Sequence, residues 1–109
     1  MNWLTLDSPK GVEDIIARSK ERPQLVFKHS TRCSISHMAK SRLERGPVSA
    51  DIDYHYLDLL QFRPLSNQIA EIFQVHHESP QILLIRNGEC IYEESHNGID
   101  PQEIISQGV

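Results

Sequence analysis

The sequence predicts an α/β fold with a central mixed sheet flanked by helices, in the element order β-α-β-α-β-α-β-β-α. Two patterns support this prediction. Short apolar runs typical of buried strands alternate with segments whose apolar residues recur every three or four positions, as on one face of a helix. The last two strands are joined by Asn87-Gly88, the strongest short signal for a hairpin. Strands that alternate with helices pair in parallel, and a closing hairpin adds antiparallel strands.

The N-terminal part of the chain predicts a strand, a helix and a second strand. Residues 3–6 favour a short first strand. Pro23 ends the helix that follows, because a proline pushes the residue before it out of the helical region. An apolar run at residues 25–27 then predicts a buried strand. The apolar face of the first helix consists of Val12, Ile15 and Ile16.

The middle of the chain predicts two more helices with a strand between them. One helix begins after Cys33 and ends at Gly46-Pro47, a pair of residues that commonly terminates helices. Residues 53–60 favour a strand, and the next helix begins near Pro64. The apolar residues that share a face are Ile35, Met38, Ala39 and Leu43 in the first of these helices, and Leu65, Ile69, Ile72 and Phe73 in the second.

The C-terminal part completes the sheet. Residues 81–86 predict an apolar strand, and Asn87-Gly88 turns the chain into a return strand from Glu89 to Glu93 or Glu94. Asp100-Pro101 then begins a short last helix. The resulting order of elements is that of the thioredoxin fold.

Length and composition indicate one globular domain over residues 1–109. The chain is 39% hydrophobic and 24% charged, and no apolar run approaches the roughly 20 residues that a membrane span needs. The N-terminus lacks the basic start and apolar region of a secretory signal, so we expect a cytoplasmic location and reduced cysteines. A net charge of −4 and an aromatic content of 6% do not suggest nucleic-acid binding.

The candidate nucleophile is Cys33, which stands where a predicted strand gives way to a predicted helix. The free N–H groups and the dipole at a helix N-terminus stabilise a thiolate. The thiolate is the reactive form of cysteine in exchange with disulfides. The alternative is a buried, unreactive cysteine without a catalytic role.

Seven short motifs are spread over nearly the whole chain. They are Phe27-Lys28-His29-Ser30-Thr31, Cys33-x-Ile35-Ser36, Leu57-Asp58-Leu59-Leu60, Ser66-Asn67-x-Ile69-Ala70-Glu71, His77-Glu78-Ser79-Pro80-Gln81, Asn87-Gly88 and Ser95-His96. With these motifs the sequence resembles the monothiol bacilliredoxins of the YtxJ type, thioredoxin-like proteins of the bacillithiol system. The family motif Thr-Cys-Pro-Ile-Ser is modified here, because Arg32 is inserted before the cysteine and Ser34 takes the place of the proline.

The resemblance implies an oxidoreductase that removes bacillithiol, or a similar small thiol, from mixed disulfides on protein cysteines. Cys33 would attack the mixed disulfide, release the client protein and carry the small thiol until a second one regenerates it. The implied partners are S-thiolated client proteins of a stress response and bacillithiol as thiol co-substrate. No tightly bound cofactor, membrane or nucleic acid is implied.

Residues beside the cysteine are candidates for supporting roles. Ser36 stands where Cys-x-x-Cys oxidoreductases have their second cysteine, so the mechanism must be monothiol. Its hydroxyl either donates a hydrogen bond to the Cys33 sulfur or belongs to an inactive serine on the helix surface. Arg32 either pairs with a carboxylate of the small thiol or is a solvated turn residue, and Thr31 flanks it. Ser34 adds a hydroxyl next to the thiolate.

Ser79-Pro80 precedes a buried strand. In the thioredoxin fold such a proline is cis and lies beside the nucleophile, and the backbone of the residue before it pairs with bound substrate like an added strand. The resemblance therefore implies a cis Pro80 and a substrate contact at Ser79. The alternative is an ordinary trans proline.

The remaining cysteine and histidines have weaker signals. Cys90 in the return strand is expected to pack as a small hydrophobe, with a resolving thiol as the alternative. His29 either influences the nucleophile or is a hydrogen-bonded structural residue. His76, His77 and His96 lack the spacing and the paired cysteines of a zinc site, so no metal is expected.

Two other functions compete with this hypothesis. Monothiol glutaredoxins bind an iron–sulfur cluster between two subunits through a Cys-Gly-Phe-Ser motif, and the present motif lacks the glycine and the phenylalanine. The other possibility is a non-catalytic, stress-related binding module that kept the thioredoxin-like fold. In that case Cys33 should be no more reactive than a free thiol.

Overall fold

A computed structural model describes residues 1–108 and confirms the predicted order of strands and helices. A short 3-10 helix is the one addition within this part of the chain. The elements are β1 (Leu4–Thr5), α1 (Pro9–Arg18), β2 (Gln24–His29), α2 (Ser34–Arg45), β3 (Asp53–Asp58), α3 (Arg63–Phe73), β4 (Gln81–Arg86), β5 (Glu89–Ser95), η1 (His96–Gly98) and α4 (Pro101–Gly108).

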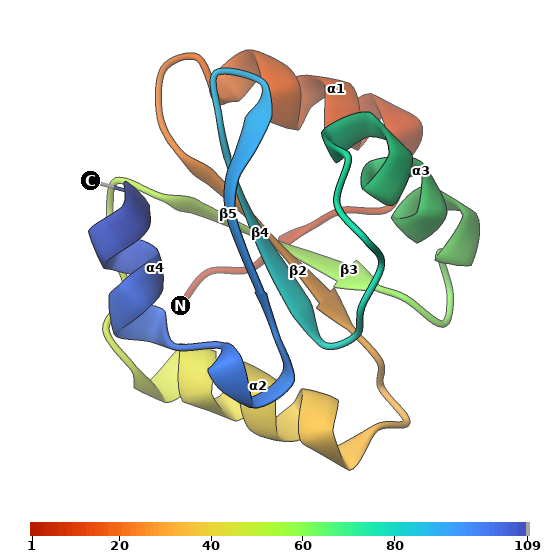
Figure 1. The fold of residues 1–109 in the computed structure, drawn as a ribbon, viewed down its shortest axis with the longest axis vertical. Helices are drawn as coiled ribbons and strands as arrows, with labels where there is room; N and C mark the ends of the chain where they lie inside the picture. The colour runs from red at the N-terminus through yellow and green to blue at the C-terminus, as the bar shows by residue number, and fades with distance from the viewer. Residues whose placement is uncertain (109) are drawn as a thin grey trace.

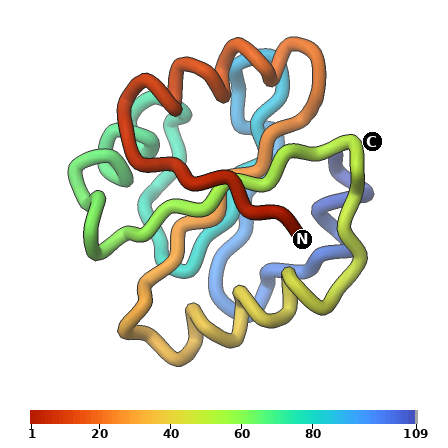
Figure 2. Tube along the Cα trace, turned by 180° about the vertical axis from the view of Figure 1, so that it is seen from behind, coloured from red at the N-terminus to blue at the C-terminus, as the bar shows by residue number. Residues whose placement is uncertain are grey.

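The five strands form one mixed sheet in the order β1-β3-β2-β4-β5 (Figure 1). β1, β3 and β2 run parallel, whereas β4 and β5 are antiparallel to their neighbours. The two edge strands lie on opposite sides of the molecule. β5 faces the viewer in Figure 1, and the N-terminal segment with β1 crosses in front when the molecule is seen from behind in Figure 2.

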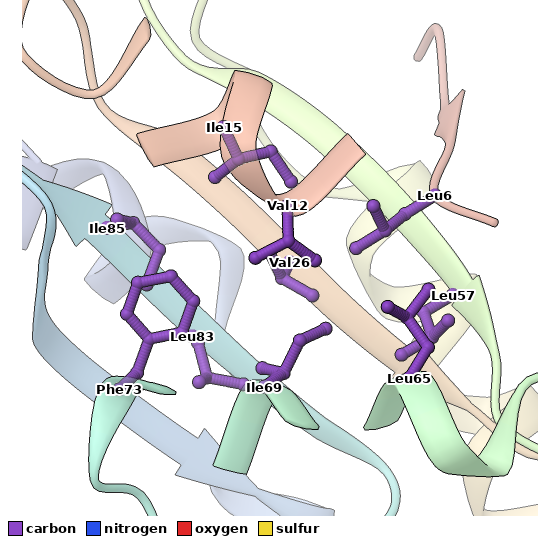
Figure 3. Packing of buried hydrophobic residues seen from close by; sticks show 10 residues of the cluster. All are labelled: Leu6, Val12, Ile15, Val26, Leu57, Leu65, Ile69, Phe73, Leu83 and Ile85. Atoms are coloured by element: carbon purple, nitrogen blue, oxygen red, sulfur yellow. The ribbon is translucent and has the colours of Figure 1, made fainter. Parts of the chain in front are cut away.

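Helices cover both faces of the sheet, α1 and α3 on one and α2 and α4 on the other (Figure 1). Successive strand side chains point to opposite faces, so Val26 joins the α1/α3 core while Leu25 and Phe27 join the α2/α4 core. This double burial explains the unbroken apolar run at the start of β2. Figure 3 shows the first core, in which residues of α1 and α3 meet those of the central strands.

The predicted core-facing sides of α2 and α3 are confirmed in part, since Ala39 and Leu43 in α2 and Leu65, Ile69 and Phe73 in α3 are buried. The other predicted residues, Ile35, Met38 and Ile72, are 43%, 59% and 42% exposed. Ser36 in α2 and Ser66 in α3 are instead fully buried. Hydrophobic periodicity does not count a serine as a core residue, so it missed these two positions.

The strands also differ in length from the prediction. β2 continues beyond the apolar run through Lys28 and His29, because both polar side chains are buried and bonded within the protein. β3 ends at Asp58, whose carboxylate accepts a hydrogen bond from the Leu60 backbone N–H at 3.1 Å and so begins a turn. Each helix within residues 1–108 is too short or too polar to cross a membrane.

A histidine is buried in β3, toward the end of the sheet at which β2 begins. Only 6% of His55 is exposed, and its Nε2 lies 2.7 Å from Oε1 of Gln24. Burial lowers the pKa of His55 to about 4, and the nearby Asp53 opposes this shift without cancelling it. The folded protein therefore keeps this imidazole neutral at a pH where an unfolded chain would protonate it.

We predict that His55 makes the fold sensitive to mild acid. As the pH falls from about 6.5 to about 4, the unfolded chain binds a proton at residue 55 that the folded chain does not, so the free energy of unfolding should fall by about 1–3 kcal/mol from this residue. Urea unfolding of the wild type and His55→Gln at pH 7 and pH 4.5 measures the difference. The exposed His76→Gln is the control, and an equal acid loss in His55→Gln and the wild type would contradict the assignment.

Candidate active site at the N-terminus of α2

Cys33 is the N-cap residue of α2, as the sequence predicts. Its backbone N–H donates to the Ser30 carbonyl at 3.1 Å, and its own carbonyl accepts the first bond of the helix from His37 at 3.1 Å. No side chain caps this helix end, so the Cys33 thiol shares its first turn with N–H groups that no side-chain acceptor satisfies. Such a position favours negative charge on the sulfur, which is partly exposed to solvent.

Ser36 is a fully buried residue that ties the cysteine loop to the sheet. Its Oγ accepts a hydrogen bond from the Ser30 N–H at 3.0 Å and lies 2.7 Å from Nδ1 of His29. The alternative of an inactive serine on the helix surface is therefore wrong. Within residues 1–108 the structure shows no hydrogen bond between Ser36 and the Cys33 sulfur, because the hydroxyl is engaged on the side of β2.

His29 is the last residue of β2, just before the cysteine loop, and is only 1% exposed. Its ring meets that of His37 edge-on at 4.8 Å, and Nε2 of His37 in turn lies 2.8 Å from the Thr31 carbonyl. Burial lowers the pKa of His29, and the nearby positive groups His37 and Lys40 lower it further. His29 is thus a buried, hydrogen-bonded histidine, and it reaches the active-site helix through Ser36.

The Ser79–Pro80 peptide bond is cis, which confirms the prediction for Pro80. Gln81 is paired with Lys28 in the β2/β4 ladder, so Pro80 lies beside the end of β2 from which the cysteine loop leaves (Figure 1). The side chain of Ser79 has its Oγ buried without a hydrogen-bond partner in the described part of the chain.

The flanking residues lie open to solvent. Thr31 and Arg32 form the exposed turn before the cysteine, and Ser34 is the exposed first residue of α2. No acidic group within residues 1–108 forms an ion pair with Arg32. These three side chains can therefore contact a molecule bound at Cys33.

A buried lysine that the sequence analysis missed lies on the face of β2 opposite to His29. Lys28 is 0% exposed, and its Nζ donates to the Ser66 carbonyl at 3.1 Å and contacts Nδ1 of His77 at 3.2 Å. Burial lowers the pKa of Lys28 to about 8. The sequence does hold a signal for this burial. Lys28 follows Val26 by two residues, so both side chains lie on the same buried face of an internal strand.

Cys90 lies far from Cys33. It stands opposite Ile85 in β5, and Ile85 stands opposite Gln24, the first residue of β2. The cysteine loop leaves from the other end of β2, about 16 Å away at the usual rise along a strand. Two cysteines this far apart cannot form a disulfide without backbone movement, so the alternative of a resolving thiol is wrong. Cys90 instead packs against the α1/α3 core, as expected.

The histidines considered for a metal site are engaged elsewhere. His77 contacts Lys28, and His76 lies 4.0 Å from Glu78. His96 begins the 3-10 helix. In the described residues, no three His, Cys, Asp or Glu side chains are grouped so as to hold a metal ion. The reactive group of the site is thus one thiol, with a hydroxyl where a second thiol would stand.

Comparison with known proteins agrees with this geometry. A solved structure described as a candidate oxidoreductase with a thioredoxin fold is 32% identical, with a TM-score of 0.83 over 95% of this chain and 91% of that one. Two thioredoxins share the fold at lower identity. One, from Malassezia sympodialis, is 13% identical with a TM-score of 0.77 over 99% of this chain and 92% of that one. The other, a variant from Halobacterium salinarum, is 18% identical with a TM-score of 0.70 over 97% and 90%.

A family model described as "Monothiol bacilliredoxin BrxC" matches residues 4–104. The match includes the cysteine loop, α2 and the loop before Pro80. Because it spans nearly the whole chain, the protein belongs to the monothiol bacilliredoxin family.

Proposed function

We propose that this protein removes bacillithiol from mixed disulfides on the cysteines of client proteins. The observation that carries the proposal is the site itself. A partly exposed thiol stands at the N-cap of α2 with a buried serine at the position of the second cysteine, in a chain of the monothiol bacilliredoxin family. Family membership supports the thiol-redox chemistry, and the choice of bacillithiol as co-substrate is our inference.

The reaction consists of two exchanges. The Cys33 thiolate attacks the bacillithiol sulfur of the mixed disulfide, the old S–S bond breaks, and the client leaves as a thiolate that takes a proton from water. Cys33 now carries bacillithiol in a new S–S bond. The thiolate of a second bacillithiol attacks the bound one, which yields oxidised bacillithiol and returns Cys33 as a thiolate. One disulfide is consumed and one is formed at each step.

The surrounding residues have matching roles in this proposal. Backbone groups of Ser79 would pair with the extended client segment, since this residue lies next to the cis proline at the end of β2. Arg32, which has no ion-pair partner in residues 1–108, would hold a carboxylate of the small thiol. Thr31 and Ser34 would border the bound thiol. S-thiolated proteins of the cytoplasm are the proposed clients.

We predict that oxidised bacillithiol forms one adduct, on Cys33. Intact-mass spectrometry of the reduced protein followed by peptide mapping should find a single added bacillithiol on that residue, and reduced bacillithiol should release it. Cys33→Ser should abolish the adduct, while Cys90→Ser should leave it unchanged because Cys90 lies at the other end of the sheet. An adduct on Cys90 alone, or none, would disprove the proposal. A visible absorption band after anaerobic purification would instead favour an iron–sulfur protein.

We also predict that the two cysteines differ in reactivity. Burial raises the pKa of the Cys90 thiol, and its sulfur lies 3.3 Å from the Tyr92 carbonyl, to which the thiol donates. Iodoacetamide at pH 7 should therefore label Cys33 at least about tenfold faster than Cys90. Timed labelling with peptide mapping measures both rates in one sample, and the Cys33→Ser and Cys90→Ser variants isolate each. Equal rates would favour the non-catalytic binding module.

A further inference from the structure

The buried hydrogen bond between His29 and Ser36 has no part in the two exchanges described above. Its donor and acceptor atoms, Nδ1 and Oγ, lie 2.7 Å apart, and both residues are almost completely shielded from water. A contact this short between two buried polar groups needs one hydrogen between them. The hydrogen comes either from the serine hydroxyl or from the imidazole.

The other partner of Ser36 limits these choices. A hydroxyl has one hydrogen to donate and two lone pairs to accept with, and the Ser30 N–H already occupies one lone pair. If Nδ1 of His29 carries no proton, the hydroxyl hydrogen must point at it. If Nδ1 carries a proton, His29 donates to the second lone pair, and the hydroxyl hydrogen is free to point elsewhere.

The Cys33 sulfur belongs to the same helical turn and, as a thiolate, can receive that hydrogen. Cys33 is the N-cap of α2, and Ser36 is its third helical residue. In capping boxes the side chain at each of these two positions reaches the backbone N–H of the other residue, so both side chains border the same turn. A free Ser36 hydroxyl can therefore donate to the thiolate, which is an acceptor for hydrogen bonds.

We propose that His29 is a positioning residue for the nucleophile: its proton state decides whether the Ser36 hydroxyl points to His29 or is free to donate to the Cys33 sulfur. The inference rests on the proposed function and deepens it, since it names the group that adjusts the stability of the Cys33 thiolate. Protonation of His29 also adds a positive charge behind Ser36, which favours the thiolate further.

The neighbours of His29 set the resting state. His37 and Lys40 face it from α2 and oppose a positive charge, whereas Asp58 on β3 favours one. The ring centroids of Phe27 and Tyr56 each lie 5.5 Å from that of His29. Burial, the largest influence, keeps the pKa of His29 below its usual range, so its ring is neutral at neutral pH. We take the neutral ring as the Nε2–H tautomer, whose bare Nδ1 accepts the Ser36 hydroxyl hydrogen. In this proposal a negative charge on the Cys33 sulfur favours a proton on Nδ1 of His29.

The first test is the pH profile of Cys33 alkylation by iodoacetamide between pH 5 and pH 9, in a Cys90→Ser background. The wild-type profile should show a second inflection on its acid side. His29→Asn keeps a hydrogen-bonding group near the Nδ1 position but takes up no proton, and Ser36→Ala removes the connecting hydroxyl. His29→Asn should give a profile with a single ionisation and a rate at pH 5.5 about three- to tenfold lower than wild type. Ser36→Ala should also lower that rate and should keep only the smaller inflection that the charge of His29 causes directly. His76→Gln, with a side chain 91% exposed, should keep the wild-type profile.

A second measurement needs no substitution at His29. Nitrogen NMR of histidine-labelled protein reports whether Nδ1 carries a proton. The pH midpoint of His29 should be higher in the free-thiol protein than after Cys33 has been alkylated, because coupled groups affect each other reciprocally. The same midpoint in both samples, or an alkylation inflection that persists in His29→Asn and disappears in His37→Gln, would overturn the inference.

Neither measurement uses bacillithiol, so the two proposals can fail separately. If bacillithiol forms no adduct but the two-step profile depends on His29, the proposed substrate is wrong and the role of His29 stands. If the adduct forms and the profile has one ionisation in every variant, the function stands and the role of His29 is wrong.

Discussion

The site depends on one buried hydroxyl. Ser36 Oγ takes a hydrogen bond from the loop that carries the cysteine and makes another with the last residue of β2. These two bonds fix the first turn of α2 against the central strand of the sheet. Because these bonds hold α2 in place, Cys33 stays at the N-cap and its thiol remains partly exposed to solvent. A surface serine at this position would leave the loop held by backbone bonds and by the contact between His37 and the Thr31 carbonyl, without a side-chain bond to β2.

The order of elements, the place of the cysteine at a helix start and the hairpin at Asn87-Gly88 were all predictable from the sequence, because they depend on local patterns. The buried polar residues of α2 and α3 were not. Each of these helices buries a serine. A pattern of apolar residues identifies side chains that can be buried without a hydrogen-bond partner. A buried hydroxyl needs hydrogen-bond donors and acceptors, and these come from distant segments of the chain.

The same reason explains why Lys28 and His29 were not recognised as buried. Both follow the apolar run of β2, where polar residues usually mark the end of a strand. Lys28 remains inside because the Ser66 carbonyl and His77, from α3 and the loop after it, receive its amine. His29 remains inside because α2 offers a hydroxyl. These partners come from far along the chain, so only the folded arrangement reveals them. Burial also removes the apolar carbon stem of Lys28 from water, which stabilises the fold. A prediction from the charge of lysine alone overlooks this contribution.

The fold keeps its two thiols beside opposite ends of β2. A molecule whose Cys33 has been oxidised cannot be reduced by its own Cys90, because that thiol is out of reach. In the proposed reaction, recovery is therefore bimolecular, and its rate is proportional to the concentration of a thiol in the surrounding solution. The oxidised fraction of the protein would then rise as the concentration of reducing thiol falls.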